Sequence, residues 1–223
     1  MKILCVSDQI DPLIYTNSIK ERFAGVDLVL SAGDLPMDYL DFIVSTLNKP
    51  TFFVFGNHNL KEYAKYRGTV DPLATGNDEP IEALSYSGAT HLGTKVKREE
   101  GLIIAGLGGC MRYNRDENQY TEFQMKMEIL KIIPNLFINR IFRGRYLDIL
   151  LTHASPRGIH DMEDRCHLGF KCFLWFMKVF RPRYLIHGHI HLYDLSTVRT
   201  TKYMDTLVIN AYSHYLLNTD EKI

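Results

Sequence analysis

The chain has 223 residues, of which 46% are hydrophobic and 23% are charged, as is typical of a globular protein rather than a disordered one. Lys plus Arg and Asp plus Glu each total 26, so the formal net charge at pH 7 is zero. That balance argues against a protein that holds long nucleic acid on a basic surface. The length predicts a single domain, residues 1–223.

The apolar runs and the cysteine spacing indicate in which cellular compartment the protein is expected. No apolar run approaches the 18 or so residues that a membrane span needs, and Asp8 interrupts an N-terminal run that is too short for a secretory signal. The four cysteines share no paired spacing, which suits free thiols in a reducing compartment. We therefore expect a cytoplasmic protein without a membrane span, and the oligomeric state stays open.

Short apolar runs alternate with helical patterns along the chain, which predicts an α/β architecture. The expected strands are residues 2–7, 26–31, 51–55, 102–107, 147–152 and 184–187. The expected helices are 16–24, 37–47, 122–133 and 169–180, and a closing hairpin is expected at 198–203 and 206–212. Residues 59–95 form a loop-rich excursion, a kind of segment that often walls a site.

Five of the six expected strands end in a residue that can bind a metal ion. Ligands of open α/β sheets bind beyond the carboxyl ends of the strands. Each such residue alone could be a turn residue or a helix cap, but turn chemistry does not require five of them. His189 and His191, two residues apart on extended backbone, point the same way. The full set is Asp8, Asp34, Asn57 with His58, His153, and His189 with His191.

These side chains indicate a particular chemistry. Carboxylate, carboxamide and imidazole groups together suit Mn, Fe, Zn or Mg. Two such ions about 3.5–4 Å apart lower the pKa of water and stabilise an in-line displacement. The sequence therefore predicts hydrolysis of a phosphate ester, either a monoester or a diester, with a small-molecule substrate.

The ordered series Asp8, Gly33-Asp34, Gly56-Asn57-His58, His153 and Gly188-His189-Ile190-His191 resembles the calcineurin-like metallophosphoesterase superfamily over residues 3 to about 212. The resemblance implies two packed mixed β-sheets flanked by helices, a binuclear centre of two divalent ions and a bridging hydroxide as nucleophile. It implies that Asp34 bridges the ions, that Asp8 and His191 complete the first site, and that Asn57, His153 and His189 complete the second. His58 matches the catalytic histidine of the family, whose implied task is to aid the leaving group.

The chain departs from the family pattern in the first motif, Asp-x-His, because Ile10 stands in the place of the histidine. Isoleucine cannot bind a metal. Candidate replacements are water, Gln9, Asp11 and His160, although His160 reads as readily as an ordinary polar loop residue. The same holds for Asp164 and His167, while His187 is expected to support the strand end.

A second departure concerns the substrate. The chain lacks the arginines that grip phosphate in the protein phosphatases of the superfamily, since Phe55 precedes Gly56 and Leu35 follows Asp34. It is more similar to the small, diverse prokaryotic phosphoesterases. Arg112, after a glycine-rich run, is a candidate to pair with a phosphate, and a plain surface role is an equal alternative on sequence grounds.

Two other interpretations stay open. Ile10 favours a binding or scaffold protein that keeps the fold with an impaired first metal site, and it also permits a one-metal enzyme that uses only the second site. Trp175, in the expected helix 169–180, lies outside the stripe expected to face the core. A core helix is the favoured explanation there, with a dimer contact or a membrane-surface contact as alternatives.

Overall fold

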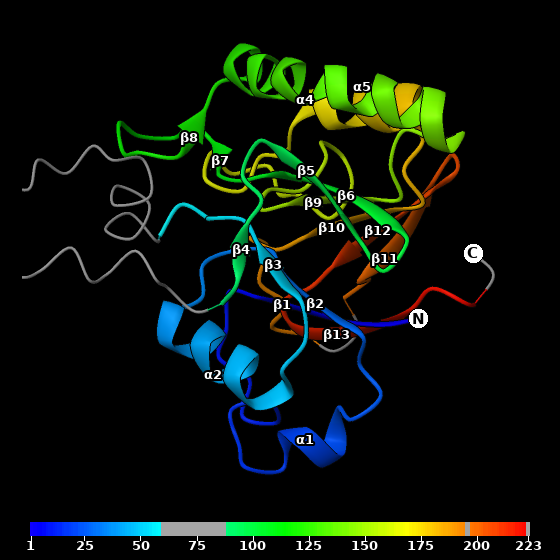
Figure 1. Ribbon diagram of the computed structural model, residues 1–223. Helices are drawn as coiled ribbons and strands as arrows, with labels where there is room; N and C mark the ends of the chain where they lie inside the picture. Colours follow the sequence, from blue (N-terminus) through cyan, green and yellow to red (C-terminus); the bar gives the residue numbers. More distant parts are fainter. Residues whose placement is uncertain (59–87, 195–196, 222–223) are drawn as a thin grey trace, which may run out of the picture.

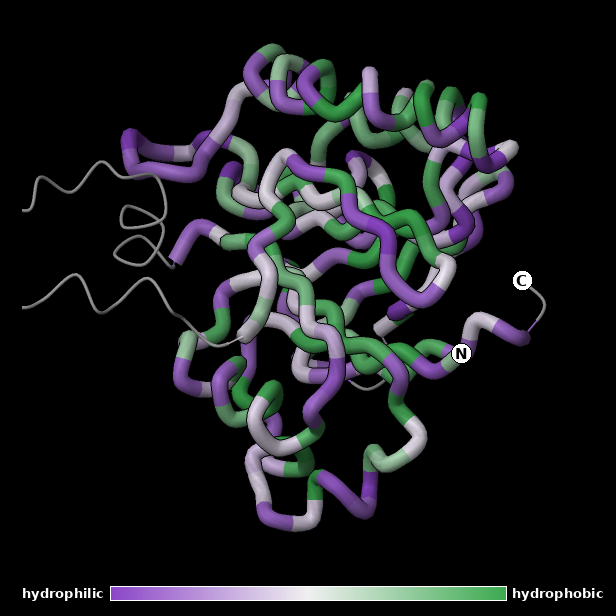
Figure 2. Tube along the Cα trace, viewed as in Figure 1, coloured by the Kyte–Doolittle hydropathy of each residue, from purple (hydrophilic) through white to green (hydrophobic). Residues whose placement is uncertain are grey.

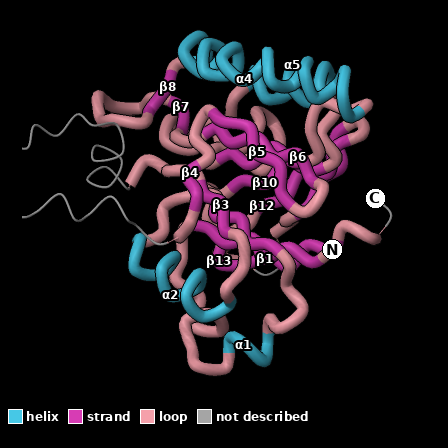
Figure 3. Tube along the Cα trace, in the orientation of Figure 1, coloured by secondary structure: helices cyan, strands magenta, loops and turns pink. Residues whose placement is uncertain are grey.

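The computed structural model describes residues 1–58, 88–194 and 197–221. In that part of the chain two β-sheets lie face to face and helices cover their outer faces (Figures 1 and 3). One sheet has the strand order β13-β1-β2-β3-β4 and the other β11-β12-β10-β9-β6-β5. Both sheets contain parallel and antiparallel pairs. This confirms the expected α/β fold with two packed mixed sheets.

The first sheet places three strand ends at one edge. It consists of β1 (Lys2–Ser7), β2 (Leu28–Ser31), β3 (Thr51–Phe53), β4 (Thr90–His91) and β13 (Ser213–Asn218). The strands β1, β2 and β3 run parallel, so their carboxyl ends share an edge. They are almost wholly buried, as their continuous apolar sequences require. The strands expected at 26–31 and 51–55 are shorter than expected, and β4 and β13 were not predicted.

The second sheet brings a matching set of ends to the same region. It consists of β5 (Lys95–Glu99), β6 (Leu102–Leu107), β9 (Ile149–Thr152), β10 (Tyr184–His187), β11 (Thr200–Tyr203) and β12 (Thr206–Asn210). The strands β6, β9, β10 and β12 are parallel, and β11 with β12 forms the closing hairpin that the sequence predicts. Beside this sheet β7 (Cys110–Met111) pairs with β8 (Gln119–Tyr120).

Three apolar clusters hold the layers together. One lies between the sheets and contains Ile3, Leu30, Ile104 and Ile186. A second joins the first sheet to α1 (Ile19–Arg22) and α2 (Met37–Leu47), and a third joins the second sheet to α4 (Glu122–Arg143) and α5 (Lys171–Phe180). Figure 2 shows the hydrophobic segments concentrated along the strands in the middle of the molecule. No helix among the described residues combines the length and the hydropathy needed to cross a membrane.

Helix α4 is longer than the sequence predicts. It was expected to end at Ile133, yet it continues through Pro134 to Arg143. Proline removes one backbone donor, but the buried stripe continues beyond it with Leu136 and Asn139, and their burial favours the longer helix. A capping box at Thr121 fixes the start of the helix, and Gly144 ends it with a φ of 75°.

Candidate metal centre

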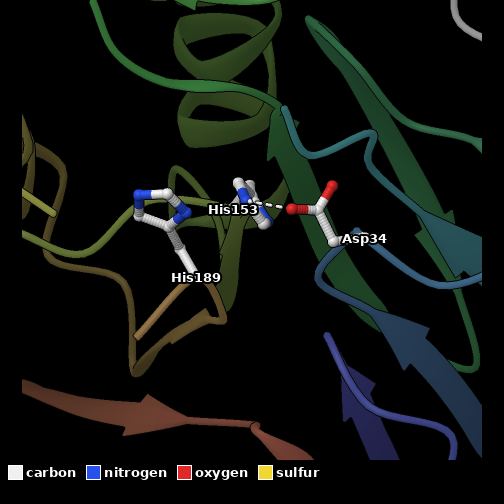
Figure 4. Close-up of side chains that lie close together, drawn as sticks. All are labelled: Asp34, His153 and His189. Atoms are coloured by element: carbon white, nitrogen blue, oxygen red, sulfur yellow. Dashed lines mark ion pairs between the residues drawn. The ribbon is translucent and has the colours of Figure 1, made fainter. Parts of the chain in front are cut away.

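Side chains from both sheets meet at the carboxyl ends of the strands. His153, which follows β9, places Nε2 3.2 Å from Asp34 Oδ2 and 3.1 Å from Asn57 Oδ1. Asp34, His153 and His189 each offer one ligand atom, and those three atoms lie within 4.8 Å of one another. Figure 4 shows the His153 ring between Asp34 and His189. Asp34 and Asn57 follow strands of the first sheet, whereas His153 and His189 follow strands of the second.

Backbone carbonyls orient the two buried imidazoles. Nδ1 of His153 lies 2.7 Å from the carbonyl oxygen of Ala32, and Nε2 of His189 lies 2.8 Å from that of Cys166. A carbonyl oxygen only accepts, so each neutral ring donates its proton there. The opposite ring nitrogen of each histidine then carries a lone pair and can bind a metal. This is the usual way in which proteins fix the tautomer of a metal ligand.

Asp8 and His191 form a second, looser group beside the first. The Asp8 carboxylate accepts from the backbone N–H of His189, with N···O distances of 3.1 and 2.9 Å. His191 Nε2 lies 3.9 Å from Asp8 Oδ1, and His191 Nδ1 lies 2.8 Å from the Tyr193 hydroxyl oxygen. The His191 ring also packs on Tyr212, with centroids 4.9 Å apart.

The charges of the centre fit a divalent cation. Burial raises the pKa of Asp8 above its ordinary value. Burial opposes charge on Asp34 and His153 too, but each stabilises the charge of the other, which lowers the pKa of Asp34 to about 2 and raises that of His153 to about 9. A proton on His153 thus balances buried carboxylates, and a metal ion would supply that positive charge instead.

The backbone of this region is strained at ligand positions. Asp8, Asp34 and His189 adopt positive φ angles of 63°, 56° and 66°. Non-glycine residues seldom adopt this region, and such strain concentrates at functional sites. Eight other non-glycine residues among those described also adopt positive φ, so this strain supports a functional site only together with the converging ligand atoms.

The glycines of the motifs are required by close packing. A Cβ at Gly33 would lie 2.6 Å from the backbone nitrogen of Gly56 and 2.9 Å from His153 Nδ1. A Cβ at Gly56 would overlap the Asp34 carboxylate, and one at Gly188 would overlap Ser7 and Asp8. Glycine therefore lets the ligand-bearing turns approach each other.

His58 is held next to the centre through its backbone. Its N–H donates to Asp34 Oδ1 at 2.9 Å, and its ring is exposed. This backbone hydrogen bond is one of the causes, after the contacts with His153, of the low Asp34 pKa. An exposed imidazole beside the Asp34 carboxylate is accessible from solvent.

The position of the missing histidine is open to solvent, since Ile10 is 42% exposed. Two of its candidate replacements are engaged elsewhere. The Asp11 carboxylate accepts from the Leu13 N–H, from the Ser213 hydroxyl and from His214. Both ring nitrogens of His160 are occupied, one by His187 at 3.0 Å and the other by the Thr201 hydroxyl at 2.8 Å. Gln9 and water stay as candidates.

The remaining predicted residues make contacts of two kinds, within their own segment or beside the histidines of the centre. Arg112 donates to the Gln119 carbonyl oxygen at 3.1 Å, a contact within the β7–β8 segment. Asp164 pairs with His167 at 2.9 Å, and the His167 ring centroid lies 5.2 Å from that of His189. His187 Nδ1 lies 2.9 Å from the Gly188 carbonyl oxygen, so this ring supports the strand end.

Two buried asparagines support the ligand turns and were missed in the sequence. Asn118 donates to the carbonyl oxygens of Phe55 at 3.1 Å and Gly56 at 2.7 Å. Asn210 donates to the carbonyl oxygen of Ile190 at 2.8 Å. Asn210 ends a strand, so the pattern that revealed the ligands could have found it, whereas Asn118 carries no such signal.

Comparison with known proteins gives one matching family and several solved structures with a similar fold. The model of the family described as calcineurin-like phosphoesterase matches residues 1–193. A crystal structure that is 17% identical aligns over 95% of this chain and 90% of its own with a TM-score of 0.64. The crystal structure of the protein TT1561 of Thermus thermophilus is 14% identical, with 95% and 89% coverage and a TM-score of 0.61. These two similarities show the fold alone. No curated protein matches the chain.

Proposed function

We propose a two-metal phosphate-ester hydrolase, on the premise that the chain belongs to the calcineurin-like phosphoesterase family. Membership implies metal-dependent hydrolysis of phosphoesters. The observation that carries the finer proposal is the convergence of ligand atoms from Asp34, His153 and His189, drawn from both sheets. The substrate class is a small phosphate monoester or diester.

The residues divide into two ligand sets that share one carboxylate. Asp8 and His191 would hold a first ion, Asn57, His153 and His189 a second, and Asp34 both. When bound, a pair of divalent ions supplies Lewis acidity, which makes hydroxide available near neutral pH and neutralises charge on the phosphate.

The side chains around the centre would position the candidate ligands and supply the proton for the leaving group. His58, exposed beside the shared carboxylate, would protonate the leaving oxygen, a task that suits imidazole near pH 7. Its backbone bond to Asp34 fixes the loop against the ligands. Tyr113 accepts from the Asn57 carboxamide at 3.2 Å, which restrains the side chain that precedes His58.

The test is metal-dependent turnover of two chromogenic esters, nitrophenyl phosphate and bis(nitrophenyl) phosphate. Wild-type protein reloaded with Mn after chelation is expected to hydrolyse at least one of them. His58→Ala should lower kcat by about 10²- to 10⁴-fold while Mn binding persists. Asp38→Asn, at an exposed position of α2 outside the centre, is the control. A Mn-loaded wild type inactive on both esters, or a His58→Ala variant at full rate, would contradict the proposal.

The exposure of Ile10 favours a second candidate, a non-catalytic scaffold or a one-metal enzyme. Elemental analysis of the protein as purified distinguishes the binuclear enzyme, the one-metal enzyme and the scaffold. Two ions per chain support the binuclear enzyme, one ion supports the single-metal version, and none supports the scaffold.

A further inference from the structure

Helix α4 has apolar residues on two opposite sides. Its buried side contains Met125, Ile129, Ile132 and Leu136. Its other side carries apolar residues at heptad-like spacing that are exposed to solvent, and at 3.6 residues per turn they share one face. Their exposed fractions are 68% for Phe123, 37% for Met127, 49% for Leu130, 49% for Phe137 and 75% for Ile141. A helix that only covers a sheet needs one apolar side.

Helix α5 extends this exposed surface. Trp175 is 45% exposed and Val179 is 41% exposed. Phe123, Met127, Leu130 and Trp175 together line an open groove between the two helices. We call the surface formed by these side chains with Phe137, Ile141 and Val179 the α4–α5 face. The two helices that carry this face form the outer layer of the molecule on the side of the second sheet (Figures 1 and 2).

The helices that carry the face are basic in a chain that is neutral as a whole. They contain six Lys or Arg residues and only two Glu residues, against 26 of each sign in the full chain. Both glutamates accept hydrogen bonds from other groups of the chain. Glu122 accepts from the backbone N–H groups of Lys171 and Cys172 at the start of α5, and Glu128 accepts from Thr94 and Lys131. The exposed cations include Lys126, Lys171 and Lys178.

We infer that the α4–α5 face binds an anionic lipid surface, with α4 lying in the plane of the interface. Aromatic and aliphatic side chains flanked by Lys and Arg on a helix are the composition of interfacial attachment. Helix α4 has 22 residues, about 33 Å at 1.5 Å per residue, which provides a long contact line. The chain would rest on the membrane without spanning it.

The positive charge of the α4–α5 face favours an anionic lipid surface over a second copy of the chain as its binding partner. A two-fold dimer would bring the same patch together on both partners. Lys126, Lys171 and Lys178 would then face like charges, whereas an anionic headgroup layer complements them. The inference goes beyond the proposed hydrolysis and stands or falls independently of it.

The only tryptophan of the chain, Trp175, lies in this face and reports on it directly. Full-length protein is mixed with vesicles of phosphatidylcholine containing about one third phosphatidylglycerol, and with pure phosphatidylcholine vesicles. We expect co-sedimentation with the anionic vesicles, weakening as salt is raised, together with a blue shift of Trp175 emission. Pure phosphatidylcholine should bind at least tenfold more weakly.

Matched variants locate the contact. Lys178→Glu and Lys126→Glu should each weaken partitioning by about fivefold or more, and Ile141→Ser should weaken it too. Lys20→Glu on α1 and Leu216→Ser on β13, both exposed in the opposite half of the molecule, should leave it unchanged.

Three results would overturn the inference. One is the absence of vesicle binding while acrylamide still quenches Trp175. Another is a Trp175 already shielded in lipid-free, monomeric protein, which would mean that the chain covers its own face. The third is a lipid-free dimer in light scattering that Ile141→Ser dissociates, which would make the occupant a second copy.

Discussion

The metal centre has a closed half and an open half. The closed half, Asn57, His153 and His189, is almost fully buried, with 3%, 0% and 6% exposure. Backbone carbonyls orient both of its rings. In the open half the side chain of His191 is 41% exposed, and its ring contacts a tyrosine that is itself 85% exposed. Ile10 stands in this half at the position where the family resemblance implies a histidine ligand. The contrast teaches that the fold would preorganise one ion site, whereas the other would combine the buried Asp8 carboxylate with an exposed histidine.

The carboxylate of Asp34, which we propose both ions share, allows the largest test, because removing its charge should erase the difference in Mn binding between the two halves. Asp34→Asn keeps the shape and tolerates the positive φ but removes the charge that both halves would use. We expect metal-stimulated hydrolysis to fall to background and both steps of Mn binding to disappear in calorimetry. Asp38→Asn, an exposed residue on α2, is the control. A remaining tight Mn step would show that the closed half binds without Asp34.

Removing one histidine from each half should sharpen the comparison. His189→Ala is expected to weaken the tighter Mn step by at least about 100-fold, and His191→Ala to weaken the other step by about tenfold, because only the first ring is buried and carbonyl-bonded. Titration of chelated protein with Mn measures both steps. Equal losses in the two variants would mean that burial does not set the order of affinity.

Restoring the missing ligand should make the halves more alike. Ile10→His adds an imidazole at an exposed position that follows β1, so little packing is lost. The weaker Mn step is expected to tighten about tenfold, and turnover should saturate at lower Mn concentration. Ile10→Leu controls for side-chain volume. An unchanged Mn dependence would mean that another group already occupies the coordination position.

The smallest effect concerns the loop that carries the open half. The pKa of Asp11 is lowered, because burial, which would raise it, is outweighed by hydrogen bonds from Ser213 and His214. A lowered folded-state pKa gives stability that is present above about pH 3.9 and is lost as the pH falls through the folded-state pKa. Asp11→Asn should therefore cost about 1–3 kcal/mol in the free energy of unfolding at pH 7.

Urea unfolding at several pH values checks this prediction. The stability gap between wild type and Asp11→Asn should narrow as the pH is lowered from 6 to 3. Asp27→Asn, which removes a carboxylate that caps the exposed backbone N–H of Lys2, provides the comparison at a site away from the loop. A difference in unfolding free energy that does not change with pH would show that the charge of Asp11 does not stabilise the fold.

The apolar strands and the residues at their ends were predictable because burial on both faces leaves a continuous apolar run. The short edge strands were not. In β5 only Val96 interrupts charged residues, and its pairing with β6 depends on backbone hydrogen bonds that any sequence can make. β13 likewise presents a mixed sequence at the edge of its sheet. Residues 59–87 of the predicted excursion lie outside the described part of the chain.

Within the candidate site, the sequence indicated candidate ligands and their spacing but not the groups that orient them. The ring of His189 is oriented by the carbonyl of Cys166, and a backbone carbonyl has no sequence identity. The role predicted for Arg112 stays a prediction, since the contact with Gln119 neither supplies nor excludes a phosphate partner. The second apolar face of α4 was visible as periodicity only once the helix was known to continue past Pro134.

The positive φ angles at Asp8, Asp34 and His189 have an evolutionary consequence. Left-handed backbone costs an L-residue roughly 1 kcal/mol or more, and glycine escapes that cost. Glycine at any of the three positions would relieve strain, so a lineage selected only for a durable scaffold would gain by acquiring it. The chain instead carries, at these positions, side chains proposed to bind cations, and it accepts that conformational cost, which is the direction expected when activity and stability compete.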